Sequence, residues 1–312
     1  MSERDAVVVG AGVIGLTTAC VLGEGGWRVR LLAAAPPQQT TSRAAAAIWG
    51  PSHAEPEEAV TAWGHAGLAA LRELARVPES GVHMARGLMA WHDGGDAPTA
   101  GAFPQVPLAP VKAPPGYAGA IALELPLVDM PRYLDYLLER SGAALEIGEL
   151  DSLDEVQAPL VVNCAGIGAG RLVDDSLVRP VRGQHLVVSN PGVREFFLEE
   201  WRTGQAHWTS WWPHGDVVVI GGTADEGNWS LEPDPRAAER MLERAVAREP
   251  RLRDARVIEH RVGLRPVRPT VRLEAESLVG RVRRVHNYGH GRSGVSLSWG
   301  CARAVLELAQ TV

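Results

Sequence analysis

Residues 6–15 read Ala6-Val7-Val8-Val9-Gly10-Ala11-Gly12-Val13-Ile14-Gly15. The first four form a short apolar run, which is typical of a parallel strand covered on both faces. The glycines follow with the spacing GxGxxG, and residues 16–22 then have the apolar character of a helix that ends at Gly25-Gly26. Because residues 27–32 alternate like a second strand, the stretch predicts a βαβ unit of about 30 residues with the glycines at its first turn.

The glycine-rich turn predicts a site for a dinucleotide. Glycines at these positions let the chain turn tightly and bring backbone N–H groups and a helix N-terminus against a pyrophosphate. An acidic residue usually follows about 20 residues later and holds the ribose hydroxyls, but here the second strand ends in Ala33-Ala34-Ala35. The ribose must therefore have other partners, and this end of the chain does not distinguish NAD from FAD.

Composition narrows the class of protein. The chain has 312 residues, of which 46% are hydrophobic and 22% charged, and a formal net charge of −6. The size predicts one large α/β domain or two closely linked ones. The acidic balance argues against nucleic acid or an anionic membrane as the main partner. Three distant cysteines, at positions 20, 164 and 301, do not form the pattern of a disulfide scaffold.

The compartment follows from what the sequence lacks. No apolar run approaches the roughly 20 residues that cross a bilayer. The polar first residues lead into an apolar stretch with glycines rather than into the cleavage site of a signal peptide. We therefore expect a cytoplasmic protein, and the sequence is compatible with a homodimer.

The remaining elements are expected from periodicity and from glycine and proline. Residues 94–119 predict a loop-rich excursion, because proline and glycine are concentrated there. Helices are expected at 131–139, with Pro131 as its first residue, and at 237–248. Pro266 and Pro269 predict a rigid turn. Further strands are expected at 160–163, at 187–188 and at 217–220, the last ended by Gly221-Gly222.

The most informative stretch is 286–302, which reads His286-Asn287-Tyr288-Gly289-His290-Gly291-Arg292-Ser293-Gly294-Val295-Ser296-Leu297-Ser298-Trp299-Gly300-Cys301-Ala302. Its small residues would admit a flat ring, and a helix over about 297–308 would place its positive N-terminus beside an anionic ring edge. The two histidines have no acidic or cysteine ligands beside them, so we expect no metal site.

This stretch closely resembles the FAD-dependent D-amino-acid oxidase family. Four other blocks are similar to the same family and occur in the family's order along the chain. They are 40–51 with Thr40-Thr41-Ser42 and Trp49-Gly50-Pro51, Val162-Asn163-Cys164-Ala165-Gly166, Arg182-Gly183-Gln184, and Gly263-Leu264-Arg265-Pro266-Val267-Arg268-Pro269. One block alone would carry little weight, but five blocks in order make the resemblance specific.

The resemblance implies an α/β fold in which a Rossmann-like FAD-binding domain of the GR2 type is interleaved with an antiparallel-sheet α+β substrate domain. The FAD-binding domain would comprise 1–52, 145–186 and 255–312, and the substrate-binding domain 53–144 and 187–254. The implied cofactor is FAD, and its implied contacts come from all these segments of the first domain. They are Gly10, Ala11, Gly12, Val13, Ile14, Gly15, Thr41, Ser42, Ala46, Ala47, Ile48, Leu150, Ala165, Gly291, Arg292, Gly294, Val295 and Ser296.

The implied reaction is oxidative deamination of a D-amino acid to a 2-oxo acid, ammonia and hydrogen peroxide, with a hydride passing to flavin N5 and dioxygen as the final acceptor. Catalysis of this kind depends on orientation rather than on a general base. By resemblance, Arg265 pairs with the substrate carboxylate, which suits its planar fork. Arg292 takes the position whose backbone carbonyl accepts from the substrate ammonium. Its long side chain departs from the family's small residue, and we expect it to point to solvent.

The substrate wall also departs from the family, because no tyrosine lies in 205–213. Its tryptophans could line an apolar pocket, although alternation places Trp211 and Trp212 on opposite faces, so at least one is expected in the core. His207 is expected at the rim. The residues predicted to line the pocket are Trp49, Gly50, His53, Trp208, Ser210 and Trp212.

Alternatives remain open at this point. A D-aspartate or D-glutamate oxidase would need a second cation, for which Arg202 and Arg292 are candidates. A glycine- or sarcosine-type amine oxidase shares the flavin fold and the arginine clamp, but the block 286–291 argues against it. A flavin-binding protein without catalytic activity is a more remote alternative, and a nicotinamide dehydrogenase is the least favoured.

Overall fold

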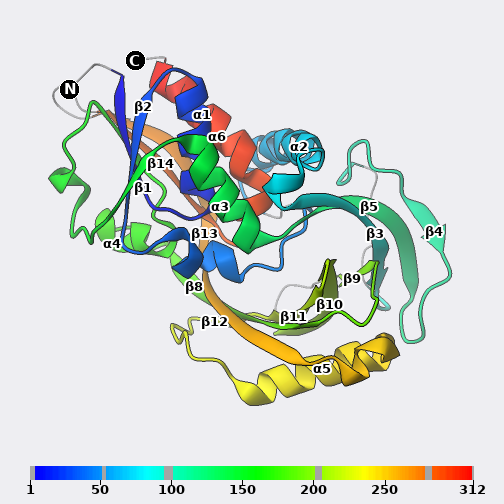
Figure 1. The fold of residues 1–312 in the computed structure, drawn as a ribbon. Coiled ribbons are helices and arrows are strands. Elements are labelled where there is room, and N and C mark those ends of the chain that lie inside the picture. The colour runs from blue at the N-terminus through cyan, green and yellow to red at the C-terminus, as the bar shows by residue number, and fades with distance from the viewer. Residues whose placement is uncertain (1–3, 51–53, 95–100, 201–205, 278–282, 311–312) are drawn as a thin grey trace.

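A single large mixed sheet forms the frame of the protein (Figure 1). The computed structural model describes residues 4–50, 54–94, 101–200, 206–277 and 283–310. The strands of the sheet lie in the order β4-β5-β3-β9-β10-β11-β8-β13-β14-β7-β1-β2-β6, and β12 pairs with β8. Their bounds are β1 Asp5–Val9, β2 Arg28–Ala33, β3 Val82–Trp91, β4 Ala109–Val111, β5 Gly119–Val128, β6 Ala144–Ile147, β7 Leu160–Asn163, β8 Arg179–Ser189, β9 Phe196–Glu199, β10 His207–His214, β11 Val217–Thr223, β12 Asp225–Glu226, β13 Val257–Ser277 and β14 Arg283–His290.

The sheet is parallel at one end, where β14, β7, β1, β2 and β6 follow one another. The four strand residues 6–9 are all buried, as expected for a strand covered on both faces. Helix α1 (Val13–Glu24) follows the glycine loop directly and leads to β2. The predicted βαβ unit is therefore confirmed, with boundaries shifted by a few residues.

The other end of the sheet is mainly antiparallel, and the long strand β13 connects the two ends. β13 pairs with β8 on one side and with β14 on the other. The prediction of a turn at Pro266 and Pro269 is wrong, because β13 continues through both prolines. Its register against β14 shifts between Val267 and Arg272, which brackets Pro269, and prolines are tolerated in strands at such irregularities. β11 likewise runs past Gly221-Gly222 to Thr223.

Helices cover the sheet in two groups. Their bounds are α1 Val13–Glu24, α2 Glu57–Leu74, α3 Met130–Ser141, α4 Ala169–Leu172, α5 Pro235–Arg248 and α6 Gly294–Gln310, with short 3-10 turns η1 Pro37–Gln39, η2 Thr41–Ala44, η3 Pro78–Ser80, η4 Leu153–Glu155, η5 Gly166–Gly168 and η6 Pro250–Asp254. α6 packs against α1 and α2, and α1 packs against α3 (Figure 1). Gly300 permits the close approach of α6 to α2, because a Cβ there would collide with the backbone of Trp63.

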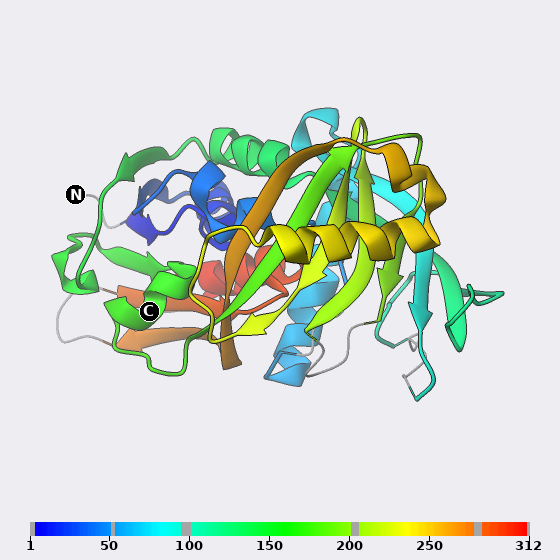
Figure 2. The same cartoon turned by 90° about the horizontal axis from the view of Figure 1, so that it is seen from below.

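The second group consists of α5, which lies across the antiparallel strands (Figure 2). Met241 and Ala245 of α5 pack with Trp211 and Ile220 in a core of their own. The side chain of Asp234 caps this helix by accepting from the N–H groups of Arg236 and Ala237.

Three helices begin earlier than expected, α3 at Met130, α5 at Pro235 and α6 at Gly294. α3 begins at Met130 rather than Pro131, so the proline is the second helical residue. Proline is still tolerated there, because the first-turn N–H groups have no intrahelical partner.

Candidate active site

The dominant feature of the molecule is a cavity of about 1470 Å³ that reaches from the glycine loop to β10. Sites for a single drug-sized ligand measure roughly 300–1,000 Å³. This cavity is therefore large enough for a dinucleotide together with a small second molecule. Segments from both ends of the sheet line it, namely 9–14, 32–35, 39–42, 44–50, 164–168, 262–269 and 287–296, with parts of β8, β10 and β12.

The glycine loop lies at one end of the cavity. Gly10 has φ +112°, and a Cβ there would collide with the carbonyl of Cys164 on the neighbouring strand. Gly12 is the N-cap of α1 and offers no side-chain cap, so the helix N-terminus faces the cavity. The Val13 N–H donates to Ser42 Oγ at 2.9 Å. Gly15 faces the Gly10 carbonyl rather than the cavity, so it permits the close packing of helix and strand.

The structure brings the other residues expected to contact the cofactor together around the cavity. All of them except Gly15 line the cavity, including Leu150 and Ala165 from the middle of the chain. Ala33, Ala34 and Ala35 also line it.

Residues 40–50 form an alanine-rich segment along the cavity, and this segment includes the 3-10 turn η2. Thr41 Oγ1 donates to the Leu264 carbonyl at 3.1 Å, which ties the segment to β13. At the other end, the Gly50 N–H donates to Ser296 Oγ at 3.1 Å, which ties it to α6. Trp49 borders the cavity, but most of its ring is core, and its Nε1–H donates to the Gly64 carbonyl in α2.

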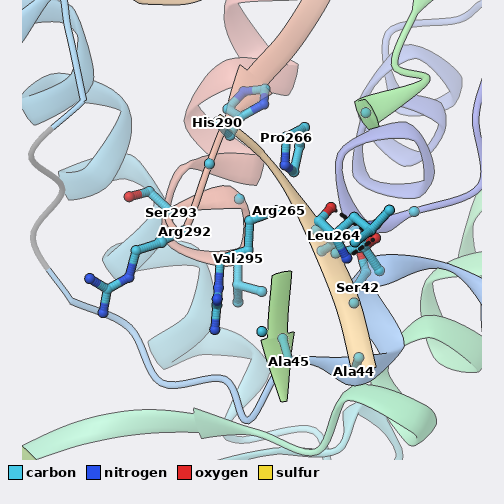
Figure 3. Close-up of a pocket in the computed structure, with 18 of the residues that line it drawn as sticks. Ser42, Ala44, Ala45, Leu264, Arg265, Pro266, His290, Arg292, Ser293 and Val295 are labelled. Atoms are coloured by element: carbon cyan, nitrogen blue, oxygen red, sulfur yellow. Dashed lines mark hydrogen bonds between the residues drawn. The ribbon is translucent and has the colours of Figure 1, made fainter. Parts of the chain in front are cut away.

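Arg265 on β13 is a half-buried cation that lines the cavity (Figure 3). Its Nη1 donates to the Thr223 carbonyl at 2.9 Å, and burial lowers its pKa to about 10, so the guanidinium is charged at neutral pH. A Cβ on Gly183 would collide with the guanidinium, so the glycine on the adjacent strand provides its space. A half-buried, cavity-facing guanidinium is suited to a carboxylate, which it can bind through two parallel hydrogen bonds.

Arg292 is an exposed residue, and its guanidinium also lies over a ring of the pocket wall. Its guanidinium carbon lies 4.9 Å from the ring centroid of Trp208, while that of Arg265 lies 5.8 Å from the same centroid. Arg292 and Arg265 extend to the same side of the pocket (Figure 3). Burial and the charge of Arg265 lower the pKa of Arg292 to about 9. The face of Trp208 holds the guanidinium at this place, because the quadrupole of an aromatic ring attracts a cation.

The tryptophans of β10 divide as alternation predicted. Trp208 and Trp212 line the cavity together with Ser210. Trp211 points to the opposite face, where it stacks on Phe197 at 4.7 Å beneath α5. Gly50 also lines the cavity. His53 and Arg202 lie outside the described residues.

Sequence reasoning missed two kinds of residue at this site. Gly183 belongs to a quoted block, but its role in making room for Arg265 appears only when β8 and β13 pair. His185 on β8 and His214 on β10 are buried, and their ring nitrogens lie 2.9 Å from the Ala44 carbonyl and 3.2 Å from the Ala46 carbonyl. The sequence does indicate these two histidines, because each is a polar residue within an apolar strand. A buried polar group of this kind requires a hydrogen-bond partner.

The lining fits a flavin dinucleotide. Gly10 and Gly12 line the cavity without side chains, so the wall of the cavity there consists of backbone groups. His290 Nε2 borders the opposite part of the cavity, is buried, and has no hydrogen-bond partner among the described residues. Burial lowers the pKa of His290 to about 3, so its imidazole is neutral and offers both a donor and an acceptor.

Neither a metal centre nor a membrane-spanning helix is found in the described part of the chain. No three His, Cys, Asp or Glu side chains of these residues lie close enough together to hold a metal ion. His286 Nε2 instead lies 3.3 Å from Glu276 Oε2. None of the described helices is long and apolar enough to span a bilayer.

Comparison with known proteins agrees with this geometry. The family model described as FAD dependent oxidoreductase matches residues 5–308. The chain is 46% identical to a D-amino-acid oxidase of Rubrobacter xylanophilus (97% of this chain and 95% of the relative). It is 34% identical to a D-aspartate oxidase of Homo sapiens (100% and 95%). The crystal structure of glycine oxidase from Geobacillus kaustophilus has the same fold, with a TM-score of 0.81 at 18% identity over 98% of this chain and 94% of that one. The chain therefore belongs to the family of FAD-dependent oxidoreductases.

Proposed function

We propose that the protein is a D-amino-acid oxidase, which converts D-amino acids to 2-oxo acids, ammonia and hydrogen peroxide. The observation that carries the proposal is Arg265, a half-buried guanidinium that faces a dinucleotide-sized cavity beside the Trp208 ring. The name of the 46% identical relative supports the same reaction. Hydride acceptance is the chemistry that FAD supplies when bound.

The protein's own part in the reaction is orientation. Arg265 holds the substrate carboxylate in a bidentate pair, and the backbone carbonyl of Arg292 accepts from the substrate ammonium. Trp208 and Trp212 form the apolar wall against the substrate side chain. Two anchors on the substrate backbone and one wall fix the direction of the Cα–H bond, which is what selects one enantiomer. Hydrolysis of the imino acid then needs only water.

The finer parts of the proposal follow the sequence expectations. Dioxygen is the proposed electron acceptor, the cytoplasm is the proposed compartment, and a homodimer is compatible with the sequence. The FAD-binding domain comprises 1–52, 145–186 and 255–312, and the substrate domain 53–144 and 187–254. Peroxide formation, cell fractionation and sedimentation velocity test the first three of these points separately.

The direct test is the absorption spectrum of the purified protein, followed by anaerobic mixing with D-amino acids, L-amino acids, glycine and sarcosine. We expect a flavin spectrum that D-amino acids bleach and L-amino acids do not. Bleaching by glycine or sarcosine alone would assign the protein to the neighbouring amine oxidases instead. A flavin that no amino acid bleaches would leave a flavin-binding protein without this activity.

A second candidate is preference for dicarboxylic D-amino acids. The position of the Arg292 guanidinium over Trp208 favours it, because two cations then border the same wall. The 34% identical D-aspartate oxidase is compatible with this reading. Acidic residues also line the cavity, including Glu199 and Asp225, so we place this candidate second.

A further inference from the structure

The alanine-rich segment 44–47 has no side chain that can hold it in place. Ala44-Ala45-Ala46-Ala47 offers only backbone groups, and Ala47 adopts φ +40°, which is strained for a residue with a Cβ. Such a conformation persists only where surrounding contacts impose it. All four residues line the cavity, so displacement of this segment would change the shape of the site.

His185 supplies one of the contacts. Its Nδ1 lies 2.9 Å from the Ala44 carbonyl oxygen, and the residue is buried in β8. Because a carbonyl can only accept, Nδ1 must carry the proton. The ring also packs edge-to-face on Trp212, with centroids 5.9 Å apart. A Cβ on Gly221 would collide with this ring, so the glycine of β11 gives it room.

His214 supplies the matching contact two residues further along. Its Nε2 lies 3.2 Å from the Ala46 carbonyl oxygen, so here Nε2 must carry the proton. The ring lies edge-to-face with His83 at 5.4 Å. Burial lowers the pKa of His185 to about 3 and that of His214 to about 4, so both rings are neutral and each has one N–H to donate.

We propose that His185 is a positioning residue that holds the segment 44–47 at a set distance from the substrate wall and from Arg265, with His214 holding the same segment at Ala46. His185 touches the segment through Nδ1 and the wall through Trp212. The half-buried guanidinium of Arg265 disfavours a second positive charge beside it, which keeps His185 in its neutral form. The role rests on the proposed function only in that the segment is taken to border the flavin.

The opposite tautomers give a reciprocal test. The amide nitrogen of asparagine falls near the place of a histidine Nδ1, and that of glutamine near the place of Nε2. His185→Asn should therefore retain the hydrogen bond and His185→Gln should lose it, whereas His214→Gln should retain it and His214→Asn should lose it. At each histidine, the variant that retains the hydrogen bond is therefore the matched control for the variant that loses it, and the two side chains have similar polarity.

The readouts are the FAD dissociation constant, the fine structure of the visible flavin bands and the flavin midpoint potential. Loss of one hydrogen bond to the segment should weaken FAD binding about 10-fold, in line with the roughly 1–1.5 kcal/mol of a buried hydrogen bond, and should alter the bands. The retaining variants should keep the wild-type spectrum and affinity. If Asn and Gln at His185 have equal effects, or neither changes the flavin, the proposal is wrong.

The two tautomers can also be measured directly in the holoenzyme, with the two retaining variants used only to assign the signals. Nitrogen-15 NMR of histidine-labelled protein should show one buried Nδ1–H tautomer that disappears in His185→Asn and one Nε2–H tautomer that disappears in His214→Gln. The reverse tautomers would overturn the proposal. None of these readouts needs a substrate, so they stand even if no D-amino acid reduces the flavin and the proposed function fails.

Discussion

The guanidinium of Arg265 occupies the space above Gly183, where any Cβ would collide with it. The two residues lie on neighbouring antiparallel strands, with Gly183 directly opposite Gly263 and Arg265 opposite Val181. The glycine of one strand therefore decides where the cation of the next strand can lie. We therefore expect Gly183 to control the position of the proposed carboxylate clamp.

Gly183→Ala should displace Arg265 from its place. The loss of one or two hydrogen bonds to a charged group corresponds to about 1.5–3 kcal/mol, so we expect the KM for D-alanine to rise roughly 10- to 100-fold. The flavin spectrum should not change. The matched control is Gly23→Ala in α1, where a Cβ meets nothing closer than 3.7 Å and activity should be unaffected. An unchanged KM in Gly183→Ala would contradict the geometry.

Arg265→Lys keeps the charge but removes the planar fork. A lysine point charge cannot reproduce a bidentate pair with a carboxylate, so kcat/KM should fall about 100-fold, or roughly 2.7 kcal/mol. FAD should still bind with its normal affinity. Stopped-flow reduction by D-alanine measures the effect, and a variant within 3-fold of the wild type would exclude the carboxylate clamp.

Arg292→Ala separates the two readings of substrate preference. If the guanidinium over Trp208 binds a side-chain carboxylate, the preference for D-glutamate over D-glutamine should fall by about 10-fold, which is roughly 1.4 kcal/mol. D-Alanine turnover should change little, because the backbone carbonyl at position 292 remains. Equal losses for D-glutamate and D-glutamine would instead assign Arg292 to the general shape of the pocket.

Three buried neutral histidines predict acid lability of the apoprotein. Burial lowers the pKa of His185 and of His290 to about 3, and that of His214 to about 4, from 6.5. Below pH 6.5 the unfolded chain therefore binds protons that the folded chain does not, and stability falls as pH falls from about 6.5 to 4. Each of these histidines lowers the free energy of unfolding by up to about 1.4 kcal/mol per pH unit in that window, and the three together by about 4 kcal/mol per pH unit.

Denaturant unfolding at intervals between pH 4.5 and 7.5 measures this slope. His214→Gln should lower this slope by at most about a third, because one linked proton is removed while His83 and His286 also have lowered pKa values. A stability that stays level across this range would show that these rings are not neutral and buried.

The cap of α5 offers a test that does not involve the active site. Asp234 Oδ1 accepts from the N–H groups of Arg236 at 2.9 Å and Ala237 at 3.1 Å. Asp234→Ala should lower the free energy of unfolding by about 1 kcal/mol. Flavin affinity and kcat should remain at wild-type values. Loss of activity would mean that α5 influences the cavity through β11.

The sequence by itself determined the local elements and the family. The run 6–15 predicts a strand, a turn and a helix because its periodicity and glycine spacing are properties of adjacent residues. The same holds for the alternation that separates Trp211 from Trp212. By resemblance to the family, the contiguous block around Arg265 predicts a carboxylate site.

Only the tertiary structure decided the contacts between distant segments. Pro266 and Pro269 suggested a turn, but pairing with β8 and a register shift against β14 keep β13 continuous. The guanidinium of Arg292 lies over the ring of Trp208, a residue 84 positions away, because the face of an aromatic ring attracts a cation. The sequence around Arg292 gives no sign of this contact. Two other residues also depend on distant partners. His185 contacts the Ala44 carbonyl, and Gly183 leaves room for the Arg265 guanidinium. A hydrogen bond or a steric space between strands depends on register, and register is set by the whole sheet.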